Sequence, residues 1–226
     1  MKPFNNLLLL PLISYFAIFL ANKNGPHPTT TKKATSSKQV LLVYVGSRTG
    51  KVNIDLGIHI ETDTSIGMRY DVTVQQGTTV LSHVAFFYKF ATPHQSVMYN
   101  YATRTTTTND WGGYNVRDQK LAVIGQEQID NYSCTHLQQE NTHSVTDYWM
   151  SQTVPGFSQF ANILTKLDPG LRAMAINGTI FNWGGLVRMK SVFSTEKATS
   201  TVTLKLEEAN TDIDFPSTDF DVPSHR

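Results

Sequence analysis

Alternation of apolar and polar residues with a period of two marks several segments of this chain as β-strands. In residues 52–61, the clearest case, Val, Ile and Leu alternate with polar residues or glycine. Residues 68–74, 187–193 and 201–207 repeat the pattern. Because successive side chains of a strand point to opposite faces, the alternation predicts an antiparallel sheet with one apolar and one wetted face.

Residues 80–90 differ from these strands because they are apolar on both faces. Phe86, Tyr88 and Phe90 share one face, and Phe87 lies on the other. A strand that is apolar on both sides is expected either at the centre of a sheet or along the wall of a cavity.

Two weaker segments leave alternatives open or point to an edge. The apolar run 40–45 is predicted as a strand or as a docked helical turn, and residues 46–50, which contain two glycines, are expected to end it. The threonine-rich segment 104–109 is expected to be an edge strand.

A further group of strands, followed by the helix, is predicted from residue 121 onward. Segments 121–128 and 132–139 flank a turn at Asp130, and segment 145–151 is expected to pair next. In the C-terminal tail, Phe215, Phe220 and Val222 are expected to anchor an otherwise acidic segment.

One helix is predicted directly after this stretch. Its apolar stripe has the i, i+3, i+4, i+7 spacing of a helix face. The stripe consists of Phe157, Phe160, Ala161, Leu164 and Leu167. Pro155 and Gly156 begin the helix, whereas Asp168 and Pro169 end it and are suited to begin a second short helix.

The N-terminus predicts export. Lys2 precedes an apolar run from Leu7 to Ala21, which is shorter than the ~20 residues that span a bilayer. Residues 1–21 are therefore interpreted as a signal peptide, with an uncleaved anchor as the alternative. Residues 22–38 are interpreted as a flexible Thr/Ser/Lys-rich leader and residues 39–226 as a single domain.

Charge is segregated along the chain. Of 19 basic side chains, five lysines lie in residues 1–38, which contain no acid, so the remainder carries 19 − 5 = 14 basic and 18 acidic side chains. An acidic body without a basic stripe argues against a nucleic-acid partner, because phosphate neutralisation supplies most of the affinity of such complexes.

Candidates for catalysis or metal binding are sparse. The single cysteine, Cys134, cannot form an internal disulfide and is expected to be a small buried hydrophobe rather than a nucleophile. His136 and His143 are interpreted as a strand histidine and a turn histidine rather than a metal pair. We therefore expect no catalytic residue, metal or cofactor, and a hydrolase using Cys134 is the weakest hypothesis.

Large apolar side chains are more numerous than a flat two-layer packing requires. They are interpreted either as core or as the lining of an apolar cleft between a curved sheet and the helix. The candidate lining residues are Phe86, Tyr88, Phe90, Tyr148, Trp149, Phe157, Phe160, Leu164 and Trp183.

Two motifs carry a resemblance to a known family. Residues 124–136, Ile-Gly-Gln-Glu-Gln-Ile-Asp-Asn-Tyr-Ser-Cys-Thr-His, are similar to the G-x-E-x-V-x-G-Y-x-C-x-x-Y signature of an uncharacterised exported bacterial family. Asp147-Tyr-Trp-Met-Ser followed by Val154-Pro-Gly-Phe is similar to its D-x-W-x-S and P-G continuation. Asn131 stands where glycine is usual in the turn.

That family resembles the periplasmic outer-membrane lipoprotein carriers. The resemblance covers roughly residues 50–223 and implies an α+β fold: a strongly curved antiparallel sheet, an open half-barrel, with one or two short helices covering its concave face. It also implies a hydrophobic cavity between sheet and helices. The functional arginine of the true carriers has no clear counterpart here.

These observations predict an exported, non-enzymatic binding protein, secreted or periplasmic, that holds a lipid, an acyl chain or another hydrophobic ligand. The alternative is an envelope structural or protein-interaction module with a filled core and no small-molecule ligand. In that case the partner is an envelope protein. Neither interpretation involves nucleic acid, and after signal cleavage neither is transmembrane.

Overall fold

A computed structural model describes residues 39–110, 121–166, 182–195 and 198–223. These residues contain eleven strands. The strands are β1 (Gln39–Thr49), β2 (Ile54–Asp63), β3 (Gly67–Gln76), β4 (Thr79–Lys89), β5 (Gln95–Asn100), β6 (Thr105–Asp110), β7 (Leu121–Ile129), β8 (Tyr132–Asn141), β9 (Ser144–Ser151), β10 (Gly185–Thr195) and β11 (Ala198–Asn210).

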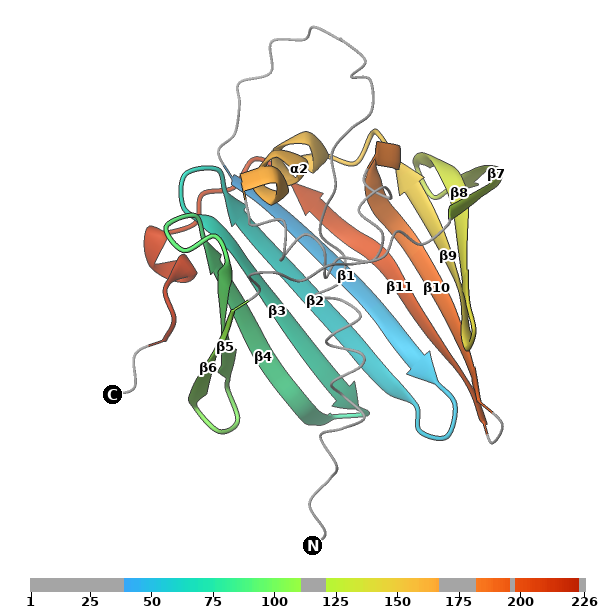
Figure 1. Cartoon of the computed structure of the whole chain (residues 1–226), viewed down its shortest axis with the longest axis horizontal. Helices are drawn as coiled ribbons and strands as arrows, with labels where there is room; N and C mark the ends of the chain where they lie inside the picture. The colour runs from blue at the N-terminus through green and yellow to red at the C-terminus, as the bar shows by residue number, and fades with distance from the viewer. Residues whose placement is uncertain (1–38, 111–120, 167–181, 196–197, 224–226) are drawn as a thin grey trace, which may run out of the picture.

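All eleven strands form one antiparallel sheet in the order β6-β5-β4-β3-β2-β1-β11-β10-β9-β8-β7. The first and last strands therefore pair with each other in the middle, and β6 and β7 form the two free edges. The sheet curls but does not close (Figure 1). The predicted antiparallel sheet is confirmed, and so is the threonine-rich edge strand.

β1 decides between two predicted alternatives and corrects one expectation. The run 40–45 is a strand, the first of the two alternatives. Residues 46–50 do not end it, because β1 continues to Thr49. Gly46 pairs with Leu56 on one side and with Leu204 on the other. A Cβ atom at Gly46 would collide with the backbone carbonyl of Thr203, so glycine here permits a close approach of strands instead of a turn.

β4 is not the central strand, since only β5 and β6 separate it from an edge. Both of its faces are nevertheless buried. Phe86 and Tyr88 join the main core, whereas Phe87 joins a small second cluster with Ala85 and Tyr99. The apolar character of both faces therefore reflects two separate clusters on opposite sides of the sheet.

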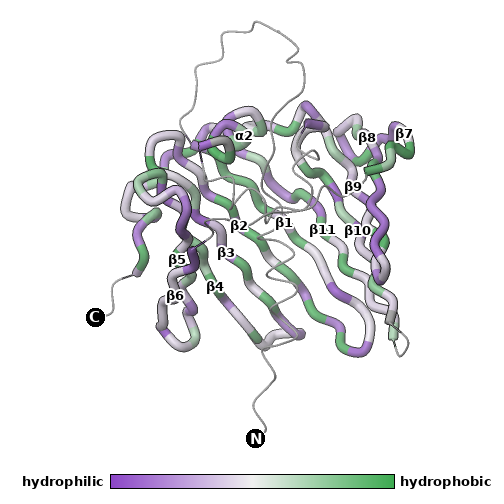
Figure 2. Tube along the Cα trace, in the orientation of Figure 1, coloured by the Kyte–Doolittle hydropathy of each residue, from purple (hydrophilic) through white to green (hydrophobic). Residues whose placement is uncertain are grey.

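Apolar side chains form rows across one face of the sheet, because residues paired directly opposite each other point the same way. The longest row consists of Val74, Leu56, Gly46, Leu204, Met189, Tyr148, Leu137 and Val123. A second row consists of Phe86, Tyr70, Ile60 and Leu42. We call the face that carries these rows the helix face and the opposite one the outer face. Figure 2 shows the alternation of apolar and polar positions along the central strands.

The helix α2 (Phe157–Lys166) lies at one end of the sheet, beside the start of β1 (Figure 1). It packs against β1 and β2. Gly156 precedes it with a φ of 73°, and a Cβ there would lie 2.5 Å from Val40 Cγ1, so only glycine fits this entry turn. The predicted first helix is confirmed over Phe157–Lys166, and the second one, from Asp168, falls outside the described residues.

The C-terminal segment crosses the outer face and contains a short 3-10 helix, η3 (Ser217–Phe220). Phe220 is 2% exposed, and Val222 packs against the second cluster, as expected for anchors. Among the described residues, no helix has the length and apolar character needed to cross a membrane.

Candidate hydrophobic ligand site

The candidate site lies where α2 meets the helix face. Four side chains of α2 are buried in the same cluster as the sheet rows, because they follow the apolar stripe of the helix. These four are Phe157, Phe160, Ile163 and Leu164. Sequence reasoning omitted Ile163, which lies three residues after Phe160 and thus belongs to the same stripe.

The structure brings six of the nine predicted lining residues to this region. Phe86, Tyr88 and Tyr148 lie on the helix face, and Phe157, Phe160 and Leu164 lie on α2. Two more, Phe90 and Trp183, are partly buried and pack against the cluster from outside the strands.

Trp149 is the ninth residue, and its side chain points to the outer face. There the indole N–H donates to Glu127 Oε2 at 2.9 Å, and the ring stacks on His136 with centroids 4.5 Å apart. The guanidinium of Arg188 lies 5.2 Å from the ring centroid of Trp149. Trp149 is therefore held by a polar outer-face cluster, on the side of the sheet opposite the candidate site.

His136 does not have the arrangement of a catalytic base. Its Nδ1 lies 2.8 Å from Glu127 Oε1 and its Nε2 lies 3.0 Å from Asp147 Oδ1. Both ring nitrogens are thus occupied by carboxylates, so neither is left to accept a proton from a hydroxyl or thiol nucleophile. The prediction that His136 is a strand histidine is confirmed.

Cys134 is fully buried, as predicted, and its thiol donates to the Tyr132 carbonyl at 3.6 Å. Burial raises the pKa of this thiol to about 11, with a smaller contribution from Glu127 and Asp130. A neutral thiol is a poor nucleophile and a poor metal ligand. No cluster of three potential metal ligands occurs in the part of the chain that the structure describes.

The helix face is mainly apolar among the described residues. Arg48 on β1 is paired with Ile54 and Val202, so it lies on this face, where it is partly exposed. The buried carboxylates of Glu61, Asp63 and Asp71 occupy alternate positions of β2 and β3, and so lie on the outer face. Two tyrosines of the helix face, Tyr44 and Tyr148, are hydrogen-bonded within the protein. Tyr44 donates to the Leu186 carbonyl at 3.1 Å, and burial raises the pKa of Tyr44.

A second cation borders this face at the end of α2. Lys166, the last residue of α2, donates to the Thr64 carbonyl at 2.6 Å, and its ammonium lies 4.8 Å from the ring centroid of Phe90. The polar end of the site is therefore at the C-terminal end of α2, next to the turn between β2 and β3.

Several solved structures are similar to this chain in fold. One is described as an outer membrane lipoprotein-sorting protein domain from Vibrio parahaemolyticus: it is 7% identical, the match covers 83% of this chain and 91% of that one, and the TM-score is 0.37. Another is a DUF1329 family protein from Desulfovibrio piger, with 9% identity, coverage of 83% and 91%, and a TM-score of 0.38. A LolA superfamily protein from Nitrosomonas europaea has 7% identity, coverage of 82% and 90%, and a TM-score of 0.34.

These values are too low to carry an argument about function. No protein of established annotation matches the chain. A family model, described as a domain of unknown function (DUF4412), matches residues 67–225, which begin at β3 and include α2 and the C-terminal segment. The resemblance to an uncharacterised family is therefore confirmed: this chain belongs to the DUF4412 family.

Proposed function

We propose that this chain is an exported, non-enzymatic protein that holds a lipid or another hydrophobic molecule between α2 and the helix face of its sheet. In this proposal the sheet is a half-barrel, the helix face is its concave side, and α2 covers one end of it. The protein acts outside the cytoplasm, after removal of residues 1–21.

The observation that carries the proposal is the difference in size between the apolar face and its helix. The longest apolar row crosses eight strands, which is about 34 Å at the usual spacing between strands. The ten residues of α2 extend for about 15 Å. The helix therefore contacts only part of the apolar surface that the sheet presents, and a flexible apolar ligand is suited to the remainder.

The chemistry of this face favours a hydrophobic ligand over a polar one. Burying each methylene of an acyl chain contributes about 0.8 kcal/mol, and the described part of the helix face offers apolar side chains with no fully buried charge among them. Two of its tyrosine hydroxyls are engaged inside the protein: Tyr44 bonds to Leu186 and Tyr148 to Gln139. A ligand would therefore be held by apolar contact and selected by size and shape.

Native mass spectrometry of the purified full chain tests the proposal. We expect an adduct of an acyl-chain lipid, which organic extraction releases, and we expect the delipidated protein to bind a fluorescent fatty acid at micromolar concentration or below. A protein that carries no adduct and does not bind the fluorescent fatty acid would contradict ligand binding.

One observation favours the second candidate, an interaction module with a filled core. Seven of the nine predicted lining residues are less than a tenth exposed, and only Phe90 and Trp183 are partly exposed. In that case the chain would bind no acyl lipid and would instead form a stable oligomer or complex through the surface or an edge of its sheet. Light scattering on the delipidated protein, alongside the fatty-acid titration, separates the two functions.

A further inference from the structure

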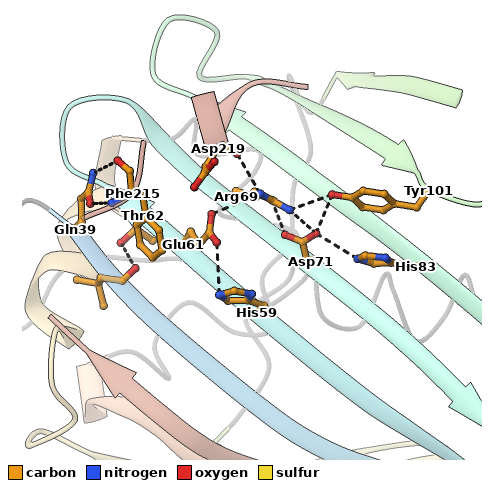
Figure 3. A network of polar contacts seen from close by, with 11 residues as sticks. Gln39, His59, Glu61, Thr62, Arg69, Asp71, His83, Tyr101, Phe215 and Asp219 are labelled. Carbon is orange, nitrogen blue, oxygen red and sulfur yellow. Dashed lines mark hydrogen bonds and ion pairs between the residues drawn. The ribbon is translucent and has the colours of Figure 1, made fainter. Parts of the chain in front are cut away.

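The outer face of β2 and β3 carries a network of ionisable side chains beneath the C-terminal segment (Figure 3). We call residues 211–223 the C-terminal strap. The network consists of His59, Glu61, Arg69, Asp71, His83 and Tyr101. It lies on the opposite side of the sheet from the candidate ligand site, so it is independent of the function proposed above.

The strap is attached to the sheet at three places. Gln39 on β1 donates to the Phe215 carbonyl at 3.1 Å and accepts a hydrogen bond from the Phe215 N–H. Arg69 Nη1 donates to the Asp219 carbonyl at 3.4 Å, and Phe220 is buried next to it. Lys89 Nζ lies 2.6 Å from Asp221 Oδ1, in an exposed ion pair that contributes little.

Arg69 connects the strap to the network. Its Nε and Nη2 donate to the two carboxylate oxygens of Asp71 at 2.7 and 3.1 Å, a bidentate pair that fixes the guanidinium plane. Its Nη1 is then directed to the strap and to Glu61, whose Oε2 lies 3.7 Å away. Figure 3 shows Arg69 between Glu61, Asp71 and Asp219.

Glu61 is the unsatisfied member of the network. Its side chain is 9% exposed, and its Oε2 has no hydrogen-bond partner among the described residues. Burial raises the pKa of Glu61 to about 7; Arg69 opposes this rise, and Asp219 and Asp71 add to it. A buried carboxylate without a hydrogen bond is costly when charged and much less so when protonated.

We propose that the C-terminal strap is a pH-dependent latch: it is held against the outer face when Glu61 is protonated and is loosened when Glu61 ionises. Undocking of the strap would expose Glu61 to water and return it to the behaviour of an ordinary carboxyl. The docked state therefore binds the proton more tightly. Linkage then requires docking to be strongest at low pH and to weaken as the pH rises through about 7.

Ionised Glu61 also acts on the strap directly. It attracts Nη1 of Arg69, the same atom that donates to the Asp219 carbonyl. It also repels the Asp219 carboxylate, which lies on the strap itself. Both effects weaken docking of the strap, and so does the free-energy cost of burying the charged Glu61 carboxylate.

Other ionisable groups face this region, and the effect of their titration must be distinguished from that of Glu61. His59 Nε2 lies 3.6 Å from Glu61 Oε1, and burial lowers the pKa of His59, an effect opposed by Asp71 and Glu208. His59 therefore loses its proton at a lower pH than an ordinary histidine does. His83 Nε2 lies 3.5 Å from Asp71 Oδ1, and burial raises the pKa of Tyr101 above 10. Variants of Glu61 retain all these groups, so they isolate its contribution.

Hydrogen exchange of the strap, measured by mass spectrometry on the full chain at pH 6.0 and 8.5, tests the latch. After correction for intrinsic exchange, we expect the protection of residues 211–223 to fall at least fivefold at pH 8.5, with no comparable fall in β11. In Glu61→Gln the strap should stay protected at both pH values. Glu207→Gln, an exposed glutamate on β11, is the matched control and should behave like the wild type.

The proposal is overturned if the wild-type strap keeps constant protection, or if Glu61→Gln shows the same fall as the wild type. Glu61→Leu provides a second non-ionisable variant in case Glu61→Gln does not fold. It should likewise remove the pH dependence of strap exchange, and retention of that dependence would again overturn the latch.

Discussion

Tyr148 and Trp149 are neighbours in β9, yet their side chains lie on opposite faces of the sheet. The Tyr148 hydroxyl donates to Gln139 Oε1 at 3.1 Å within the core, whereas the Trp149 indole donates to Glu127 Oε2 at 2.9 Å on the outer face. The period of two in a strand requires this separation. Because the two side chains lie on opposite faces, Tyr148 belongs to the candidate ligand site and Trp149 does not.

Substitutions on the two faces should therefore affect ligand binding differently. We expect Phe160→Ala, which removes a ring between α2 and the sheet, to weaken binding of a fluorescent fatty acid about tenfold, because apolar contact area is lost. Trp149→Phe should leave that affinity within twofold of the wild type. Equal losses in both variants, measured by titration, would contradict the assignment of the site to the helix face.

Substitutions of Tyr148 and Gln139 should have non-additive effects on the free energy of unfolding, because the two side chains share a buried hydrogen bond. Tyr148→Phe leaves the buried Gln139 carbonyl oxygen without this donor, and we expect a loss of about 1–3 kcal/mol. Adding Gln139→Met should recover part of this loss, since no unpaired polar group then remains. Urea unfolding of the two single variants and the double variant measures the interaction energy between the two side chains. If the two losses simply add, the hydrogen bond does not contribute as predicted.

Gly46 should tolerate no side chain. In Gly46→Ala the new Cβ meets the Thr203 carbonyl in the middle of the sheet, and we expect a loss of about 3 kcal/mol or more, from displacement of β11. Gly125→Ala is the matched control, because it also lies in a strand but nothing lies within 4 Å of its Cβ. Its stability in urea should stay within about 0.5 kcal/mol of the wild type.

Cys134 should be inert in the folded protein. Because burial raises the pKa of its thiol to about 11, little thiolate exists at neutral pH, and the side chain is also shielded from reagents. We expect alkylation by iodoacetamide at pH 7.5 to be at least a hundredfold slower in the folded protein than in urea. Rapid labelling of the folded chain, followed by mass spectrometry, would instead revive a nucleophilic role.

Asp63 should stabilise the fold in a pH-dependent way. Burial alone would raise its pKa, but hydrogen bonds from Ser65, Gln39 and Ile66 outweigh burial and lower it. A lowered native pKa gives stability that is present above the unfolded pKa and is lost as the pH falls through the native value. Asp63→Asn should therefore cost about 1–2 kcal/mol at pH 7 and less at pH 3, because the advantage of the charged form decreases as the pH falls. Exposed Asp55→Asn is the control, and a loss that persists unchanged at pH 3 would contradict the prediction.

Elements with a local signal could be predicted from the amino-acid pattern alone. The alternation in residues 52–61 placed β2, and the stripe from Phe157 to Leu164 placed α2, because side-chain direction within one strand or helix depends only on its own period. The burial of Cys134 and Phe220 also followed from their own segments. Gly46 misled the sequence analysis, because glycine marks a turn and a close approach of strands equally well.

The order of the strands in the sheet, and the face that each strand presents to α2, became known only from the folded structure. Pairing of β1 with β11 joins residues more than 150 positions apart, and the apolar row from Val74 to Val123 exists only after this pairing. The same holds for Arg69, whose Nη1 donates to the carbonyl of Asp219, 150 positions away in the chain. Contacts of this kind arise from long-range packing, which a local period of two does not specify.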